Sequence, residues 1–226
     1  QTVIQVESLW ETDGGNDFID ANQPGGADLV LGGAGNDVIF GGQTDTSTDI
    51  LLGDNGVVYF NTGNAATAFD VASRAPAVGG IDTISGGWGD DIVLGGQGND
   101  VLSGGRGSDA VLGDNGYVSR DSNGAITRVE TSDPEFGGDD DIDETGFEGS
   151  DVVFGGSGDD DIYGGNATQG DVFIGDNGVL AGGLSLIKPN LSETDVNDIY
   201  TKDGQHGGRD RIFGSAGPDV IMGGSN

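Results

Sequence analysis

The feature that most constrains this chain is a nine-residue repeat. Three tandem copies of the pattern G-G-x-G-x-D-x-U-x, in which U is a large apolar residue, occupy residues 86–112. The same frame recurs along the 226-residue chain and places an Asp at its sixth position thirteen times. These residues are Asp17, Asp28, Asp37, Asp49, Asp82, Asp91, Asp100, Asp109, Asp151, Asp160, Asp171, Asp210 and Asp219. Thirteen matches in one frame indicate a repeat architecture rather than a low-complexity segment.

The period predicts one turn and one short strand per repeat. Gly tolerates positive φ, so G-G-x-G-x-D can form a tight turn, and the apolar x-U-x segment suits a strand. Side chains alternate between the faces of a strand, so the eighth-position residue points inward. The inward residues are Ile19, Val30, Ile39, Leu51, Ile84, Val93, Leu102, Val111, Val153, Ile162, Phe173, Ile212 and Ile221. Two repeats complete a coil, so the sequence predicts an all-β fold, a parallel β-roll (right-handed β-solenoid) with a thin apolar core.

The nonapeptides resemble the RTX (repeats-in-toxin, haemolysin-type) calcium-binding repeats, whose motif has this form. The resemblance implies several Ca²⁺ ions held between stacked turns by Asp carboxylates and by carbonyl groups of turn glycines. It also implies type I secretion from a Gram-negative-like bacterium, and therefore an extracellular or cell-surface location. The turn glycines expected to contribute carbonyls include Gly33, Gly35, Gly87, Gly89, Gly96, Gly98, Gly105, Gly107, Gly156 and Gly158.

The charge of the chain agrees with cation binding. Asp and Glu number 39 against 8 Lys and Arg, which gives a net charge of -31. Aligned carboxylates repel one another without a cation and become cross-links around a hard cation, which prefers six to eight oxygen ligands. The expected neighbours across one gap are Asp82 with Asp100, Asp91 with Asp109, Asp17 with Asp37, Asp28 with Asp49, and Asp151 with Asp171. The alternative is that these Asp residues only cap turns.

Composition and motifs exclude several other functions. The negative charge disfavours nucleic acid and anionic lipid as partners, and no apolar run reaches the ~18 residues of a membrane span. The chain has no Cys, and His206 is its one His, without a nucleophile-elbow sequence. We therefore expect neither a zinc site nor catalysis, and we predict that the chain is not an enzyme.

A longer period overlies the nonapeptides. The motif Gly-Asp-Asn-Gly recurs at residues 53–56, 113–116 and 175–178 and closes each run of repeats. It divides one elongated domain, which we expect to be part of a longer array, into blocks and insertions. The predicted roll blocks are 12–56, 79–116, 149–178 and 207–226, and the insertions are 57–78, 117–148 and 179–206. The motif Asp residues, Asp54, Asp114 and Asp176, are either additional ligands or only turn residues.

Each insertion opens like a β-hairpin. The expected strand pairs are Tyr117–Arg120 with Ala125–Val129, Val57–Phe60 with Ala65–Phe69, and Val179–Ala181 with Leu184–Ile187. One roll sheet also carries apolar residues on its outer face, including Leu29, Leu31, Ile50, Leu52, Ile92, Leu94, Leu112, Phe154 and Ile174. A parallel sheet that is apolar on both faces is normally covered on both. We expect either the hairpins or a neighbouring chain to cover this face.

The acidic run 139–144 resembles the start of an EF-hand loop, but Glu144 stands where Gly is needed and Ser150 where the closing Glu belongs. We expect a solvated acidic loop there.

Two functional hypotheses remain. The first is a structural or adhesive module of a secreted or cell-surface bacterial protein, such as an adhesin stalk, surface layer or extracellular filament, which folds on binding Ca²⁺. The alternative is the non-catalytic segment of a secreted protease, lipase or epimerase. The block pattern favours the first hypothesis.

Overall fold

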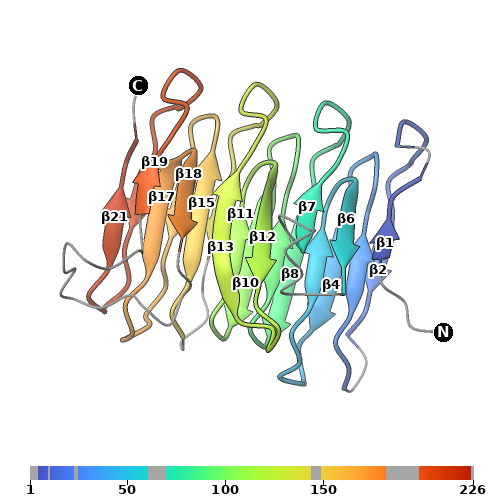
Figure 1. Cartoon of the computed structure of the whole chain (residues 1–226), viewed down its shortest axis with the longest axis horizontal. Helices are drawn as coiled ribbons and strands as arrows, with labels where there is room; N and C mark the ends of the chain where they lie inside the picture. The colour runs from blue at the N-terminus through green and yellow to red at the C-terminus, as the bar shows by residue number, and fades with distance from the viewer. Residues whose placement is uncertain are drawn as a thin grey trace.

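The computed structural model describes residues 5–9, 11–22, 25–60, 70–143, 149–181 and 199–224. These residues form three seven-stranded sheets, whose strands succeed one another along the long axis of the molecule (Figure 1). No helix occurs in this described part, and hence none that could cross a membrane. The all-β prediction is confirmed.

Two of the sheets are parallel and form the roll. The first roll sheet contains β2 (Phe18–Asp20), β4 (Val38–Gly42), β8 (Thr83–Trp88), β10 (Val101–Arg106), β14 (Asp141–Asp143), β16 (Asp161–Tyr163) and β20 (Arg211–Phe213). The second roll sheet contains β3 (Leu29–Leu31), β5 (Ile50–Leu52), β9 (Ile92–Leu94), β11 (Ala110–Leu112), β15 (Val152–Gly156), β17 (Val172–Asp176) and β21 (Val220–Met222). The chain alternates between the two sheets, so each strand pairs in register with a strand of the next coil, as Leu102 does with Ile84.

The roll core is the predicted ladder of eighth-position residues. From Ile39 to Phe173 the predicted side chains are buried, and Ile19 and Ile212 pack partly buried against them. Ile221 differs, with an exposed fraction of 49%. It lies on β21, the edge strand of its sheet, which pairs on one side with β17. The alternation of side chains in each strand therefore places the core as the repeat predicts.

The third sheet is antiparallel and is called the cover sheet below. It contains β1 (Gln5–Glu7), β6 (Gly56–Tyr59), β7 (Val71–Ser73), β12 (Gly116–Arg120), β13 (Ile126–Thr131), β18 (Gly178–Ala181) and β19 (Ile199–Thr201), in that order. The predicted hairpin of Tyr117–Arg120 with Ala125–Val129 is present as β12 and β13. The predicted strands Ala65–Phe69 and Leu184–Ile187 lie outside the described residues. β6 pairs with β1 and β7, and β18 pairs with β13 and β19.

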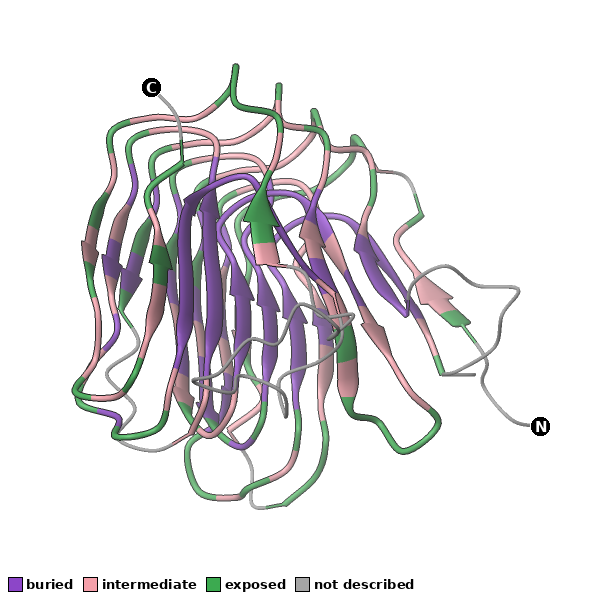
Figure 2. Cartoon of the chain, turned by 60° about the vertical axis from the view of Figure 1, so that its left-hand side comes forward, coloured by how far each residue is buried: buried purple, intermediate pink, exposed green. Residues whose placement is uncertain are grey.

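The cover sheet packs on the outer face of the second roll sheet. A second apolar core lies between them and joins Val58, Val118 and Val129 of the cover sheet to Ile92 and Phe154 of the roll. Most of the predicted outer apolar residues are buried here, and Leu29 and Leu31 are partly buried. Figure 2 shows buried residues along the interior strands and exposed residues at the turns. The chain thus covers its own apolar face, and a neighbouring chain is not required for this.

The described part of the acidic run, residues 139–143, is not the solvated loop that the sequence predicted for 139–144. The structure places 141–143 in the first roll sheet as β14, paired with β10 and β16. Asp140 is only 2% exposed and Ile142 is fully buried in the roll core, whereas Asp139 is exposed. The chain therefore returns to the roll near Gly137, within the range predicted as an insertion.

Candidate metal-binding columns

The turn Asp residues form two continuous columns along the roll. The first column, before the strands of the first roll sheet, contains Asp17, Asp37, Asp82, Asp100, Asp140, Asp160 and Asp210. The second column, before the strands of the second roll sheet, contains Asp28, Asp49, Asp91, Asp109, Asp151, Asp171 and Asp219. In each column the backbone N–H of one Asp donates to Oδ1 of the next Asp, as between Asp82 and Asp100 at 2.8 Å. All five expected pairs are adjacent.

Asp140 is the column member that the nonapeptide frame missed. Its Oδ1 accepts from the N–H of Asp100 at 2.8 Å, and its own N–H donates to Asp160 at 2.9 Å. A shorter signal, Gly-Gly-x-Asp-x-Ile, could have found it. The pattern begins at Gly79, Gly137 and Gly207, each time where the chain returns to the roll after an insertion.

In nine of the fourteen column residues the second carboxylate oxygen is buried and has no hydrogen-bond partner among the described residues. This holds for Oδ2 of Asp37, Asp49, Asp82, Asp91, Asp100, Asp140, Asp160, Asp171 and Asp210. Burying a carboxylate oxygen without a partner is energetically costly, and a bound cation removes that cost. Capping of the turn in the preceding coil therefore accounts for only one oxygen of each of these carboxylates.

The ten predicted turn glycines all have positive φ, for example 110° at Gly87 and 135° at Gly89. Several also stack so closely on the preceding coil that a side chain would not fit. A Cβ on Gly98, Gly107 or Gly158 would collide with the carbonyl oxygen of a glycine in the coil before. The turn carbonyls therefore point along the roll axis from one coil towards the next.

The oxygen atoms around each turn suit a hard cation. A Cβ on Gly41 would lie 2.7 Å from Oδ2 of Asp49 and 2.5 Å from the carbonyl oxygen of Gly86. An unpartnered carboxylate oxygen and a backbone carbonyl oxygen thus border the same small space. Among the described residues no three acidic, His or Cys side chains converge as a metal site. A cation here would therefore need backbone carbonyl ligands, which Ca²⁺ accepts.

Electrostatics also favour a cation at the columns. Burial, together with the charge of a neighbouring Asp, raises the pKa of Asp82 and Asp91 to about 7 and that of Asp100 and Asp160 to about 8. Hydrogen bonds from backbone N–H groups lower the pKa of these groups but do not offset the burial. Ionising the columns is therefore unfavourable unless positive charge enters between the coils.

The Asp residues of the Gly-Asp-Asn-Gly motifs are bonded differently. Oδ1 of Asp54 accepts from the N–H of Gly80 at 3.1 Å, and Oδ2 accepts from the N–H of Gln97 at 2.6 Å. Asp114 accepts in the same way from Gly138 and Ser157. Both oxygens of these two carboxylates are thus used by backbone donors, which favours the turn alternative. Their role as calcium ligands, like that of Asp176, stays a prediction.

Comparison with known families agrees with this geometry. The model of the RTX calcium-binding nonapeptide repeat matches residues 25–59, 78–102, 85–117, 145–168 and 206–226, together just over half of the chain. The chain belongs to the RTX calcium-binding nonapeptide repeat family. Its RTX repeats identify it as a calcium-binding structural module, a class that is generally non-catalytic. Comparison with curated proteins and with solved structures gives no match.

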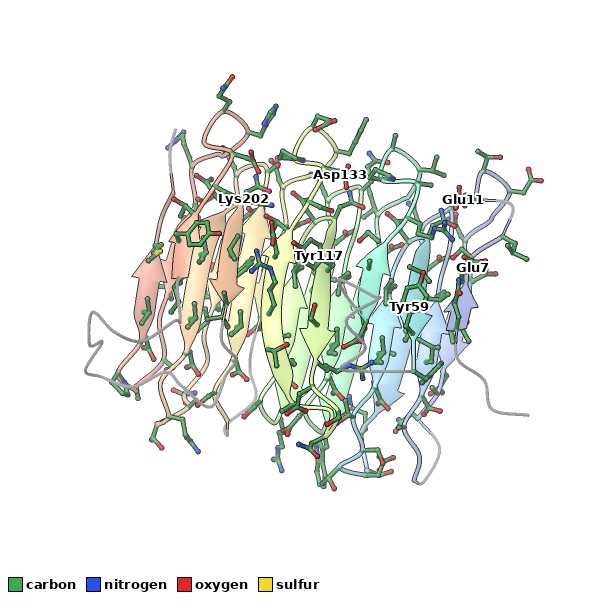
Figure 3. All side chains as sticks on the ribbon, in the orientation of Figure 1. Glu7, Glu11, Tyr59, Tyr117, Asp133 and Lys202 are labelled. Carbon is green, nitrogen blue, oxygen red and sulfur yellow. The ribbon has the colours of Figure 1, made fainter. Side chains whose placement is uncertain are left out.

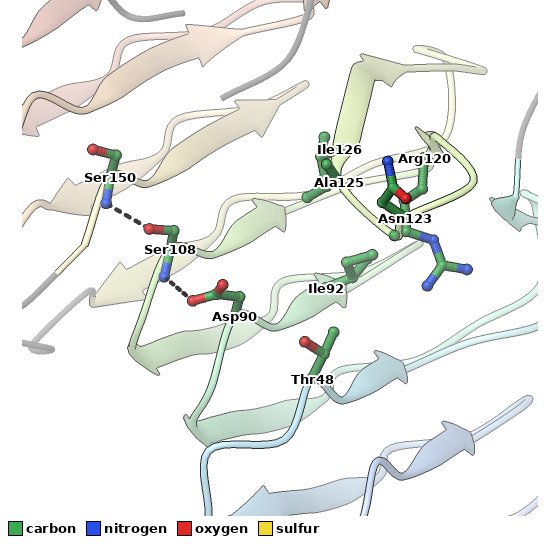
Figure 4. Close-up of a pocket in the computed structure, with 10 residues that line it drawn as sticks. Thr48, Asp90, Ile92, Ser108, Arg120, Asn123, Ala125, Ile126 and Ser150 are labelled. Carbon is green, nitrogen blue, oxygen red and sulfur yellow. Dashed lines mark hydrogen bonds between the residues drawn. The ribbon is translucent and has the colours of Figure 1, made fainter. Parts of the chain in front are cut away.

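A cavity of about 590 Å³ lies beside the RTX turns. It is bounded by the tip of the β12–β13 hairpin and by residues at or just before the starts of β5, β9, β11 and β15 of the second roll sheet (Figure 4). Part of its polar lining is engaged in the fold, whereas the buried Nε of Arg120 has no hydrogen-bond partner among the described residues. Asp90 accepts from the N–H of Ser108, and Ser108 Oγ accepts from the N–H of Ser150 at 3.0 Å. The side chain of Arg120 pairs with Asp70 at 3.8 Å. We assign the cavity no ligand.

Proposed function

We propose that this chain is a calcium-dependent structural module of a secreted or cell-surface bacterial protein. Ca²⁺ enters the gaps between coils, and the column carboxylates and turn-glycine carbonyls bind it. The thirteen Asp residues of the nonapeptide frame and Asp140 act as the acidic ligands. Binding then joins each coil to the next, so the free energy of metal binding becomes free energy of folding.

The observation that carries this proposal is the row of buried, unpartnered Oδ2 atoms in two aligned columns. A chain with a net charge of -31 and carboxylates stacked coil upon coil is self-repelling without a cation. Extracellular calcium modules typically bind at about 10⁻⁴–10⁻³ M. The module therefore stays open in a calcium-poor compartment and folds after export, where it can act as a rigid stalk, layer or filament element.

A calcium titration followed by circular dichroism tests this proposal. β-Structure should appear as Ca²⁺ is added to the metal-free chain and should be lost again with excess chelator. Mg²⁺ at the same concentration is the control, because it demands a smaller octahedral shell and should not substitute. A chain that is equally folded in excess chelator would refute the proposal.

A further inference from the structure

The three Gly-Asp-Asn-Gly segments are the points where the chain changes layer, and they are called corners below. At residues 53–56, 113–116 and 175–178 the chain leaves the second roll sheet after β5, β11 and β17 and enters the cover sheet as β6, β12 and β18. Each corner thus connects the metal-binding turns to the layer that covers the roll.

The Asp of a corner joins two turns of the first column. In the middle corner, Oδ1 of Asp114 accepts from the N–H of Gly138, where the chain returns to the roll, at 2.9 Å. Oδ2 accepts from the N–H of Ser157, in the hexapeptide turn of the next coil. Asp54 makes the same two bonds. Asp176 repeats the first of them, with Gly208, at 2.9 Å.

The Asn of a corner holds the far end of the insertion. The side-chain Nδ2 of Asn115 donates to the backbone carbonyl oxygen of Phe136 at 2.8 Å. The backbone carbonyl oxygen of Asn115 accepts from the N–H of Ser132 at 2.8 Å. The corresponding backbone bonds, from the N–H of Arg74 to the backbone carbonyl oxygen of Asn55 and from the N–H of Lys202 to that of Asn177, are also 2.8 Å long. Figure 3 shows Asp133, next to Ser132, and Lys202 near the same edge of the molecule.

The last Gly of a corner lets the cover strand approach the roll. A Cβ on Gly116 would collide with the side chain of Leu112, and one on Gly56 with that of Leu52. Leu52 and Leu112 are buried beneath the cover sheet. The motif therefore has one residue for the turns, one for the end of the insertion and one for close packing.

We propose that Asp54, Asp114 and Asp176 are positioning residues that couple the ordered turns to docking of the cover sheet, and that Ca²⁺ is held without them. This inference rests on the proposed function of the columns. The N–H groups directed at both oxygens of Asp54 and Asp114 bring positive partial charge to the places where a cation would bind. The neighbouring column carboxylates, in contrast, keep an oxygen free of such donors.

The coupling has a structural consequence. When the turns are ordered, the N–H groups of Gly138 and Ser157 donate to the carboxylate of Asp114. These bonds fix the corner, and the corner sets the direction in which β12 crosses the second roll sheet. Loss of the corner bonds releases the cover strands and exposes apolar side chains such as Leu94 and Phe154, which are at most 1% exposed when covered. The corner thus transmits order from the turns to the cover sheet.

The experiment uses the full chain at saturating Ca²⁺ and the variants Asp114→Asn and Asn115→Asp. The first is isosteric and removes one of the two acceptors, and the second removes the donor that binds Phe136. Asp159→Asn is the matched control, because Asn already occupies this turn position as Asn36 and Asn99. Bound calcium is counted by equilibrium dialysis, and amide hydrogen exchange is followed in β12, β13 and β18.

We expect Asp114→Asn and Asn115→Asp to bind as many calcium ions as the natural chain. Their cover-sheet amides should exchange about tenfold faster, the ratio that corresponds to one ordinary buried hydrogen bond, while the control stays unchanged. Fewer bound ions in Asp114→Asn would make Asp114 a ligand and overturn the proposal. Unchanged exchange in both variants would overturn the coupling. If Asp114→Asn does not fold, Asn115→Asp alone decides the coupling. Absence of bound calcium in the natural chain would instead overturn the proposed function.

Discussion

The stacking of turn glycines can be tested within a single turn. Gly33 and Gly35 belong to the same hexapeptide and both have positive φ, 100° and 127°. A Cβ on Gly33 would meet nothing within 4 Å, whereas a Cβ on Gly35 would lie 2.7 Å from the carbonyl oxygen of Gly15. Replacing either by Ala imposes the same kind of backbone strain, of about 1–3 kcal/mol. Only Gly35→Ala also pushes two coils apart.

The additional cost of Gly35→Ala follows from the displacement. The contact must open from 2.7 Å to the 3.4 Å of an ordinary van der Waals contact. This movement strains the bonds between the same two turns, from the N–H of Asp17 to Asp37 at 2.7 Å and from the N–H of Asn36 to Asn16 at 3.1 Å. Overpacking of this kind costs about 1–3 kcal/mol. Gly35→Ala should therefore destabilise these coils by that amount more than Gly33→Ala.

Hydrogen exchange at saturating Ca²⁺ measures the difference, because each coil of a solenoid contacts only its neighbours and the effect is local. The amides that join β2 to β4, such as the N–H of Val38 bonded to the carbonyl of Asp17 at 2.9 Å, report on it. They should exchange about five- to 140-fold faster in Gly35→Ala than in Gly33→Ala, since 1.4 kcal/mol is tenfold. Equal exchange in the two variants would refute the stacking argument.

Three further predictions concern the cores, the columns and pH. Phe154→Ala should lower the free energy of unfolding by about 3–5 kcal/mol, and Phe213→Ala, at a residue 54% exposed, by about 0.5 kcal/mol; equal losses in urea titrations at fixed Ca²⁺ would contradict the three-layer core. Asp140→Ala should reduce bound calcium in equilibrium dialysis as much as Asp100→Ala does, while Asp139→Ala should not. If Asp140→Ala binds as much calcium as the unchanged chain, Asp140 is not a ligand. Burial raises the pKa of several column carboxyls from 3.8 to between about 6 and about 8. Between about pH 4 and about pH 8 the metal-free folded chain therefore binds more protons than the unfolded chain, so its stability should rise as pH falls; circular dichroism in chelator that shows less β-structure at pH 5 than at pH 8 would contradict this.

The nonapeptide frame carried most of the information about the roll. Its period predicts the strands, the inward ladder from Ile39 to Phe173 and the adjacency of pairs such as Asp82 and Asp100, and the structure contains all three. It failed at Asp140, which lies within the acidic run 139–144, although the same shortened repeat was found at Asp82 and Asp210. A run of acidic residues read locally resembles a solvated loop. Its burial depends on a strand, β10, that lies 40 residues earlier in the chain.

The sequence by itself determined the architecture of one coil, because turn and strand preferences act between residues that are close neighbours in the chain. It also indicated that one roll sheet needed a cover. Only the tertiary structure decided what the cover is. β7 pairs with β12, and β13 pairs with β18, although each pair joins two different insertions. These partners meet because stacking of the coils brings successive insertions side by side over one apolar face. No local sequence pattern encodes a pairing between strands that are so far apart in the chain.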